Sequence, residues 1–412
     1  MNKNTVAEIK KDLVGGMGLT ECAKKHDISR GAVYAIQTGK THKDVPWPGL
    51  NVKPVDLTDQ RLQLLEAENL HLREELTNKN KVIKSSRRDQ GLRQVAVEEL
   101  QNFKPMRPLP CQIKPSGKNK IKEHAVLVLS DGHHDQRVTP EECGGLEEYN
   151  FDISCARAEN LVESTIDWTQ HTLQNFEFQT LNIFSLGDST SGEIHGAKDR
   201  SEYRNQIKNC LAIGQLHALM IRDLAPFFPQ VNVVCLSGNH GRRSHQKDYH
   251  GAQDNWDYLI AEVARMHLRD IPNVNFTIPN SWAANITIDD VCFHLTHGDD
   301  VRGWNGVPFY GLVRRQRNLM ALAPVQPGPP PRYITMGHHH VAGSLADVNG
   351  ELLLNGAWVG TDSYAYNSFA GYREPCQLLH GVNSKYGVTW RMNVRLRSEK
   401  EKNGPQRYKV QI

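Results

Sequence analysis

The chain is predicted to be an α/β protein whose polar chemistry lies at the carboxyl ends of buried strands, preceded by a small all-helical unit. Three observations predict this fold class. Short, nearly continuous apolar runs recur from residue 125 onward in the 412-residue sequence, and such runs are typical of strands buried on both faces. Helical patterns lie between the runs. Each of five runs is followed by residues of types that bind metals.

Composition narrows the class of protein without naming a function. The hydrophobic fraction of 39% and the charged fraction of 23% are ordinary for a globular protein. A net charge of +3 is too small to indicate nucleic acid binding by itself. The eight cysteines contain no C-x-x-C pair, so neither a disulfide framework nor a thiolate zinc site is expected. Neither a secretory signal nor a membrane-spanning stretch is recognisable, so we expect a cytoplasmic protein without a membrane partner.

Residues 1–48 are predicted to form short helices at 5–13, 19–26 and 30–37, with Ser29 capping the last one. Small and apolar residues would form the buried face, namely Ala23, Ile28, Val33 and Ile36. The pattern resembles the helix-turn-helix of resolvases and of homing-endonuclease accessory domains. That resemblance implies DNA contacts from exposed residues of the last helix and beyond, namely Arg30, Tyr34, Gln37, Lys40 and Lys43. The alternative is a small helical adaptor that contacts protein.

Residues 58–100 are predicted to contain an amphipathic helix and a basic connector. Prolines at 46, 48 and 54 mark a linker, and from 62 to 83 apolar and near-apolar positions recur at three- and four-residue spacing. Asn69 falls where a parallel dimer can use a polar residue to fix its register, whereas Lys79 falls where an apolar residue is preferred. Two interpretations remain open, a homodimer formed through residues 62–83 and a single helix packed on the rest of the chain.

Residues 120–400 are predicted to form the catalytic domain. The expected strands share the short apolar pattern and lie at 125–129, 181–184, 231–236, 291–293, 333–336 and 352–354. Helices are expected at 156–171, 205–224 and 309–322. In such folds, ligands bind where loops converge at the carboxyl ends of the strands.

Five strand ends carry metal-ligand residue types. In order they are Asp131-Gly132-His133, Gly187-Asp188, Gly238-Asn239-His240, His297-Gly298 and Gly337-His338-His339-His340. In extended backbone, residues i and i+2 point the same way, so Asp131 and His133 are expected to share one metal, and His338 and His340 to lie on one side. The glycines permit tight turns.

This ordered set resembles the calcineurin-like metallophosphoesterase superfamily, whose motifs run D-x-H, G-D, G-N-H, H-G and G-H-x-H. The resemblance implies a sandwich of two β-sheets flanked by helices and a site for two divalent metal ions. The ligands of the first ion would be Asp131, His133 and His340, those of the second Asn239, His297 and His338, with Asp188 bridging both. Oxygen and imidazole ligands suit Mn²⁺, Fe, Zn²⁺ or Mg²⁺, and family habit favours Mn²⁺.

The resemblance also implies that a metal-bridging hydroxide attacks phosphorus in line, with His240 protonating the leaving group. Gly241 departs from the family, because many of its nucleases carry an acid there, so a contact to His240 is expected from elsewhere. Other residues have two interpretations each. Asp299 and Asp300 would support the ligands or be solvated loop acids, and His134 would touch substrate or be a surface histidine. His195 would touch a substrate phosphate or belong only to its glycine-rich loop.

Arginines favour a nucleic acid substrate. Arg242 and Arg243 follow His240, and the predicted helix 309–322 carries Arg314, Arg315 and Arg317. Because arginine clusters suit phosphate backbones, the expected activity is that of a DNA nuclease, similar to the double-strand-break-repair branch and more loosely to phosphoesterases encoded by bacteriophages. One alternative is hydrolysis of a small nucleotide or phosphomonoester. Another is a DNA-binding regulator with an inert phosphoesterase fold, although the intact ligand set disfavours it.

Overall fold

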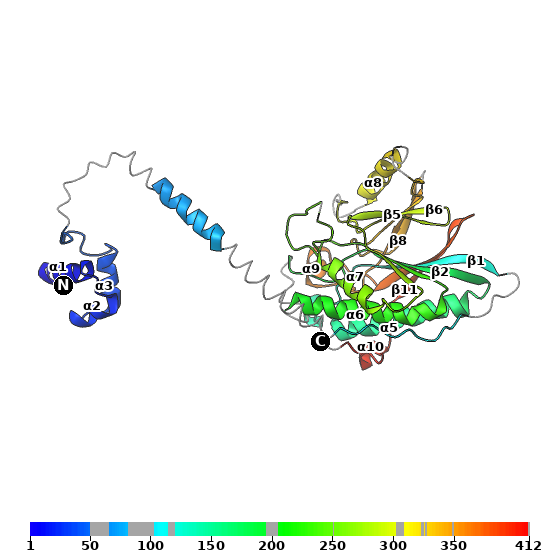
Figure 1. The fold of residues 1–412 in the computed structure, drawn as a ribbon, viewed down its shortest axis with the longest axis horizontal. Coiled ribbons are helices and arrows are strands. Elements are labelled where there is room, and N and C mark those ends of the chain that lie inside the picture. Colours follow the sequence, from blue (N-terminus) through cyan, green and yellow to red (C-terminus); the bar gives the residue numbers. More distant parts are fainter. Residues whose placement is uncertain are drawn as a thin grey trace. The chain divides into compact units, whose positions relative to one another are not determined.

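The computed structural model describes residues 1–49, 66–80, 103–113, 120–194, 205–249, 251–301, 309–322, 325, 328–347 and 350–410 (Figure 1). The chain divides into two compact units, Met1–Asp89 and Gln90–Ile412. Among the helices in these described ranges, none is long and apolar enough to cross a membrane.

Residues 1–49 of the N-terminal unit form three short helices, as predicted. They are α1 (Lys3–Val14), α2 (Leu19–Lys25) and α3 (Arg30–Gln37). Ser29 caps α3 by accepting a hydrogen bond from the backbone N–H of Ala32 at 3.2 Å. The helices enclose a small apolar core of Val6, Ile9, Cys22, Ala23, Val33, Ile36 and Val45, with Ile28 packed against it. The predicted buried face is therefore confirmed.

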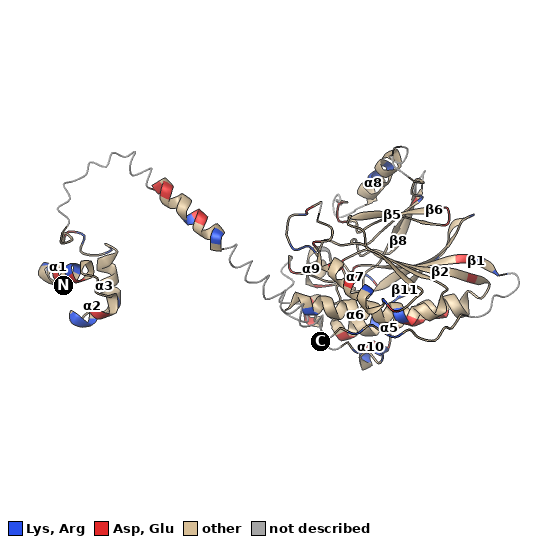
Figure 2. Ribbon diagram, in the orientation of Figure 1, with Lys and Arg blue, Asp and Glu red and all other residues tan. Residues whose placement is uncertain are grey.

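Residues 66–80 are helical, and every residue of this stretch is exposed. Figure 2 shows acidic and basic residues along it. The helix predicted for 62–83 is confirmed for these residues, whereas its two ends and most of the basic connector fall outside the described residues.

The larger unit contains two stacked mixed sheets. The first has the strand order β11-β10-β1-β2-β3-β4 and the second the order β5-β6-β7-β9-β8. The first sheet is built from β1 (Ile121–Leu129), β2 (Phe176–Ser185), β3 (Val231–Cys235), β4 (Val274–Thr277), β10 (Cys376–Asn383) and β11 (Gly387–Arg395). The second contains β5 (Ala283–Ile288), β6 (Val291–Thr296), β7 (Tyr333–Met336), β8 (Gly343–Asp347) and β9 (Gly350–Leu354).

Helices flank the sandwich, and the alternation of side chains along the strands explains why. Ala125, Leu127 and Leu129 of β1 point to a core shared with α5 (Phe151–Asp167), α6 (Gln206–Leu224) and α7 (Trp256–His267). Val126 and Val128 point to the core between the sheets. Both faces of β1 are therefore buried, as its continuous apolar run predicted.

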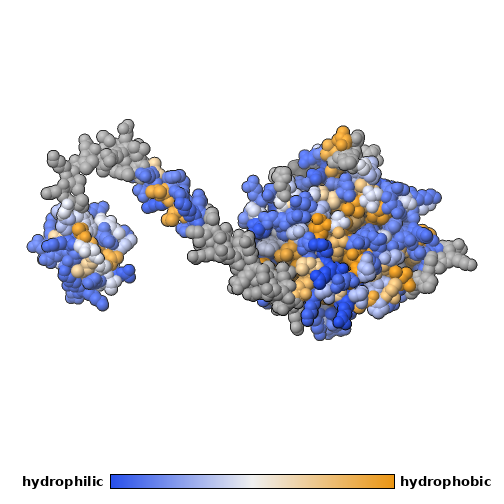
Figure 3. Space-filling view, viewed as in Figure 1, coloured by the Kyte–Doolittle hydropathy of each residue, from blue (hydrophilic) through white to orange (hydrophobic). Residues whose placement is uncertain are grey.

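On its other face the second sheet packs Ile334, Met336, Leu352 and Leu354 against Leu312 of α8 (Phe309–Leu322). Short helices complete the unit: η1 (Pro140–Cys143), η2 (Trp168–Thr172), η4 (Ala225–Phe227), α9 (Ser363–Phe369) and α10 (Lys400–Asn403). Figure 3 shows that hydrophilic residues cover much of the visible face of each unit, with apolar areas among these residues.

All six predicted strands are present, and the α/β sandwich flanked by helices is confirmed. The helix predicted at 156–171 begins earlier, at Phe151, because Asn150 caps it by accepting from the N–H of Ile153, and it ends in the π-helical turn η2. Strands β4, β5, β8, β10 and β11 and helix α7 were not predicted. In β11, for example, exposed and half-buried residues interrupt the buried ones, so the strand lacks a continuous apolar run.

Candidate metal centre

Each of the five predicted ligand motifs follows a strand directly. Asp131 comes after β1, Asp188 after β2 and Asn239 after β3. In the second sheet, His297 comes after β6 and His338 after β7. Neighbouring strands β1, β2 and β3 are parallel, as are β6 and β7, so their carboxyl ends meet at the same edges of the two sheets. Loops from both sheets therefore contribute to one site.

The loops bring the predicted ligands together in linked groups. Asp131, His133 and His340 form one group, and Asp188, His297 and His338 form another. A third group of His133, Asp188 and His240 joins them, and in each group the candidate ligand atoms lie within 4.8 Å of one another. Asp188 thus lies where the two predicted sets of ligands meet.

Hydrogen bonds connect the members of these groups. The Nε2 atom of His297 lies 2.9 Å from Oδ2 of Asp188 and 3.0 Å from Oδ1 of Asn239. The Nε2 atom of His340 lies 3.4 Å from Oδ1 of Asp131. All seven residues predicted as metal ligands are therefore placed together by the fold.

The backbone at this site is strained. Of the nine non-glycine residues with positive φ in the described ranges, five are predicted ligands, namely Asp131, His133, Asp188, His338 and His340. Left-handed conformations of such residues cost energy and persist where the surrounding structure enforces them, often at functional sites. The strain is independent evidence that these positions serve the site.

The same angles correct the extended-backbone argument. Asp131 and His133 do share a group, but with φ of 52° and 40° they lie in tight left-handed turns and not in extended chain. His338 and His340 also have positive φ, and they belong to the two different groups expected for them.

Glycines allow the loops to touch. A Cβ atom on Gly187 would lie 2.2 Å from the backbone N of Gly238, and a Cβ atom on Gly238 would lie 2.4 Å from the backbone N of Asp188. Backbone atoms cannot yield at such distances, so these two glycines are required for the approach of the second and third loops.

The buried carboxylates keep their charge. Burial disfavours the charged form of Asp131, but the positive charges of His340 and His297 outweigh it and hold the pKa of that carboxyl at about 2. Burial is likewise outweighed at Asp188, whose pKa lies well below the ordinary value because of the charge of His297. The site therefore holds two anionic groups that are almost inaccessible to solvent and favour cations nearby.

The imidazoles respond in two ways. Burial lowers the pKa of His133 to about 3 and that of His338 to about 4, so both rings are neutral and offer lone pairs. Burial also opposes the charge of His297, but Asp188 raises the pKa of that ring to about 10 through its charge and its hydrogen bond. His297 thus carries positive charge where a cation would otherwise compensate Asp188.

This donor set fits divalent cations. Buried carboxylate and amide oxygens lie beside imidazole nitrogens, and among the described residues no thiolate belongs to these groups. The chemistry of the ligands suits Mn²⁺, Fe, Zn²⁺ or Mg²⁺, as expected from the sequence.

His240 is oriented by a backbone carbonyl. Its Nδ1 lies 3.1 Å from the carbonyl oxygen of Ser191, which can only accept, so Nδ1 carries a proton and Nε2 is the other ring nitrogen. The backbone N–H of His240 donates to Oδ1 of Asp188 at 2.8 Å. The contact to His240 that Gly241 cannot provide thus comes from Ser191.

The other predicted residues occupy varied positions. Arg242 donates from Nε to the carbonyl of Asn239 at 3.0 Å, which places its cation beside the loop. Arg243 instead pairs with Asp254 at 2.8 Å. The predicted phosphate contact His195 lies outside the described residues.

Two acids after His297 form ion pairs of their own. Asp299 accepts both its hydrogen bonds from Lys247 at 2.8 Å, and Asp300 pairs with Arg315 of α8 at 2.6 Å. Neither is a simple solvated loop acid, although the charge of Asp299 helps to raise the pKa of His297.

The interpretation of His134 as a surface histidine is wrong. Its side chain is buried and lies between Ser154 and His217, with ring nitrogens 2.6 Å and 3.1 Å from them, and it packs edge-on against Trp358. The residue next to His133 therefore faces the interior.

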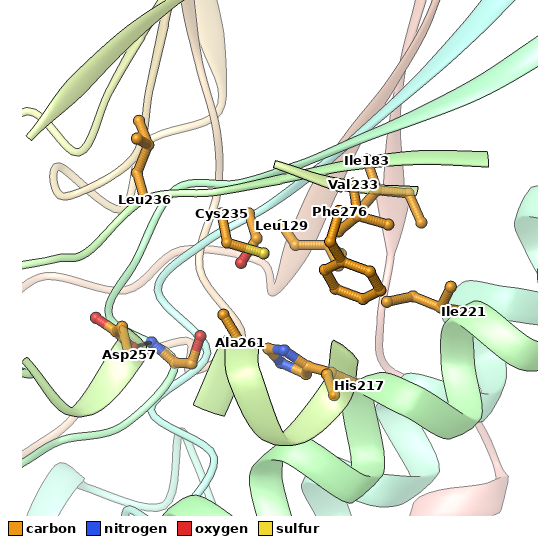
Figure 4. Close-up of a pocket in the computed structure, with 13 residues that line it drawn as sticks. Leu129, Ile183, His217, Ile221, Val233, Cys235, Leu236, Asp257, Ala261 and Phe276 are labelled. Carbon is orange, nitrogen blue, oxygen red and sulfur yellow. Dashed lines mark hydrogen bonds between the residues drawn. The ribbon is translucent and has the colours of Figure 1, made fainter. Parts of the chain in front are cut away.

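Sequence reasoning missed Asn255 and Asp257, at the start of α7. Asp257 is buried and accepts hydrogen bonds from the backbone of two ligand loops. Figure 4 shows it at one edge of a small, largely apolar pocket between the first sheet and the helices, with His217 below and Phe276 on the far side. The only available signal was an Asn-x-Asp pattern before a helical stretch, which also describes an ordinary N-cap.

A further group of possible ligands, Asp12, Cys22 and His26, lies in the N-terminal unit. Asp12 already pairs with Lys25 at 2.8 Å and with His26 at 2.5 Å, so we assign it to joining α1 and α2.

No family model and no curated protein matches this sequence. Similar solved structures include an archaeal phosphodiesterase at 10% identity and a TM-score of 0.31, covering 65% of this chain and 99% of that one. Zinc-bound Vps29 from Entamoeba histolytica is 13% identical with a TM-score of 0.29, covering 66% and 99%. A predicted phosphoesterase from Streptococcus pneumoniae is 11% identical with a TM-score of 0.26, covering 66% and 98%. At these values we assign neither family nor activity from the likeness.

Proposed function

We propose that this protein is a dinuclear metal-dependent phosphodiesterase that cleaves DNA. The observation that carries the proposal is the pair of His/Asp groups that share one buried carboxylate, Asp188, at the edge where loops from both sheets meet. Two neighbouring cations are the arrangement used for displacement at phosphorus.

Each residue has a defined part in this proposal. Asp131, His133 and His340 hold one ion, and Asn239, His297 and His338 hold the other, with Asp188 shared. When bound, the ions activate a water and neutralise charge on the phosphoryl oxygens. His240, held through Nδ1 by Ser191, delivers a proton from Nε2 to the leaving oxygen. Arg242 adds positive charge beside Asn239 and favours an anionic substrate.

The N-terminal unit supports DNA as the substrate. Arg30, Tyr34 and Gln37 are exposed on α3 at intervals of four and three residues, which places them on one side of the helix. Val33 and Ile36 are buried on a neighbouring side of the helix. Lys40 and Lys43 continue the exposed cationic surface beyond the helix. An exposed polar helix face with cations suits a DNA groove.

The catalytic proposal is tested by Mn²⁺-dependent hydrolysis of labelled single- and double-stranded DNA beside bis-p-nitrophenyl phosphate. Wild type is compared with Asp188→Ala and His240→Ala. Cleavage of DNA by wild type alone supports the nuclease, and product lengths separate endonuclease from exonuclease action. Hydrolysis of the small ester without DNA cleavage refutes DNA as the substrate and favours a small nucleotide. Inactivity toward both, with metal bound, refutes the enzyme and favours the regulator.

DNA binding is tested by fluorescence anisotropy at several salt concentrations. We expect Arg30→Gln to weaken binding by ~1–3 kcal/mol and, if Arg30 contacts phosphate, to reduce the salt slope by about 1. Lys24→Gln, at an exposed position on α2, is the matched control. Equal affinity of Arg30→Gln and wild type would count against α3 as the DNA-contacting helix.

We also propose a homodimer formed through residues 62–83. The described part of this helix, residues 66–80, is fully exposed and presents Leu72 and Leu76 to solvent at 54% and 61% exposure. Covering such side chains in a coiled coil is favourable. Mass in solution, measured before and after deletion of residues 1–84, tests the dimer, and a monomer in both cases would refute it.

A further inference from the structure

The first turn of α7 lies directly against two of the ligand loops. The carboxylate of Asp257 accepts hydrogen bonds from the backbone N–H groups of Asp188 and Ser189 at 3.0 Å each, and from that of Gly238 at 2.9 Å. Asp257 is only 5% exposed. One buried carboxylate therefore joins the loop after β2 to the loop after β3.

The two residues before Asp257 form hydrogen bonds with both ends of a segment in the loop after β3. The side-chain amide of Asn255 donates to the carbonyl oxygen of Gly238 at 2.9 Å. The backbone N–H of Trp256 donates to the carbonyl oxygen of Gly241 at 2.7 Å. Between these two anchored glycines lie Asn239 and His240.

The fit leaves no room for a side chain at Gly241. A Cβ atom there would lie 2.0 Å from Oδ1 of Asn255 and 2.9 Å from Oδ2 of Asp257. Asn255 cannot retreat easily, because its Oδ1 also accepts from the backbone N–H of Asp257 at 2.8 Å. The position after His240 thus holds glycine and no acid, and the side chains of Asn255 and Asp257 occupy the space beside it.

We propose that Asn255 and Asp257 are positioning residues of the metal centre, which fix the spacing between Asp188 and the Asn239–His240 loop. The inference rests on the proposed metal-dependent function. Neither side chain belongs to a ligand group in the described residues, and Asp257 faces backbone N–H groups, so both act through the ligands they hold.

Charge-assisted bonds from one carboxylate to three N–H groups are stronger than neutral ones, and they hold ligands in place before a metal arrives. In Asp257→Asn, one acceptor oxygen becomes an NH₂ group that faces backbone donors. The loops must then move apart or leave a buried donor without a partner. The expected result is weaker binding of metal by a folded protein.

The experiment is calorimetric titration of the full-length, chelator-treated protein with Mn²⁺. We expect two ions per wild-type chain, and an affinity reduced ~10–100-fold in Asp257→Asn with the same final stoichiometry. Asp254→Asn, whose carboxylate is 65% exposed on the same segment, is the matched control and should bind like wild type. The kcat of Asp257→Asn should recover at high Mn²⁺, which a general loss of folding would not allow.

Asn255→Asp guards against misfolding of the first variant, because it keeps the side-chain shape and the acceptor for the N–H of Asp257, while a carboxylate oxygen replaces the amide donor to Gly238. We expect it to bind Mn²⁺ more weakly than wild type and more tightly than Asp257→Asn. Wild-type Mn²⁺ affinity in either folded variant would overturn the positioning role. A wild-type protein that binds no divalent cation would instead overturn the proposed function, and with it this inference.

Discussion

Replacement of Asp188 by asparagine is the sharpest test of the proposed centre. Asp188 is the carboxylate common to two ligand groups, with Oδ2 2.9 Å from His297 Nε2 and Oδ1 accepting the N–H of His240 at 2.8 Å. Asp188→Asn keeps the shape of the side chain and removes its charge. Both ions are therefore expected to lose a ligand oxygen with anionic charge.

The magnitude follows from the shared position. Loss of residues that only support ligands already costs 10–100-fold in metal affinity, so loss of a shared charged ligand should cost at least ~100-fold for each ion, or ~2.7 kcal/mol. At a Mn²⁺ concentration ten times the wild-type Kd, occupancy of each site would fall from ~90% to ~10%, and double occupancy to ~1%. Initial rates of DNA cleavage should fall by ~100-fold or more.

The assay combines calorimetric titration with Mn²⁺ and initial rates of cleavage of labelled DNA at that fixed Mn²⁺ concentration. Asp290→Asn, at an exposed turn between β5 and β6, is the control and should match wild type in both measurements. Two tightly bound ions in Asp188→Asn, or cleavage within a few-fold of wild type, would refute the assignment of Asp188 as the shared ligand.

Three further predictions concern proton transfer and stability. His240→Ala should lower kcat by ~10²–10⁴-fold and change the Mn²⁺ affinity little, because the ring is placed to move a proton. Steady-state kinetics measure kcat and calorimetry measures the Mn²⁺ affinity, and a loss mainly in Mn²⁺ affinity would contradict this role. Burial lowers the pKa of His380 to about 3 and that of His217 to about 4, so both contribute stability that is complete above pH 6.5 and is lost as pH falls through those values. Urea unfolding in chelator at pH 7, 5 and 4 should show this loss as a fall in the free energy of unfolding. His380→Leu should reduce the slope of that free energy against pH by up to ~1.4 kcal/mol per pH unit, and an unchanged slope would exclude His380 as a source of the pH dependence. Arg157→Met should destabilise the fold by ~1.5–3 kcal/mol in thermal unfolding, because it removes one of the two arginines that lie 3.0 Å from the carboxylate of Glu147, which is 1% exposed, and leaves Arg397 as the other; a stable variant would show that Arg397 alone is sufficient.

The strands that the sequence predicted share one property, which is burial on both faces. The run 125–129 is apolar at every position because its side chains pack alternately against the helices and against the second sheet. Strands with one exposed face, such as β11, are not distinguished from loops by that criterion. Helix α7 was not predicted although its buried residues are mostly apolar, because the polar residues around its N-cap are typical of a loop.

The identities of the candidate ligands were also accessible from the sequence. Their residue types and their position after apolar runs indicated a site at converging strand ends, and the resemblance to the metallophosphoesterase motifs selected the seven residues. How they converge was not accessible. Asp131, His133, Asp188, His338 and His340 have positive φ, and no spacing rule for extended chain describes such turns.

The sequence by itself thus determined the α/β class, the three N-terminal helices and the set of residues that meet at the candidate centre. These features depend on local chemistry: apolar periodicity, capping side chains and residue type. Only the tertiary structure decided that Ser191 orients His240, that His134 is buried, and that Asp257 holds two ligand loops. Those contacts join backbone and side-chain atoms of residues that are far apart in the chain or that lie in turns with left-handed backbone. Packing of the folded chain brings the two partners of each contact together, so no sequence pattern identifies them.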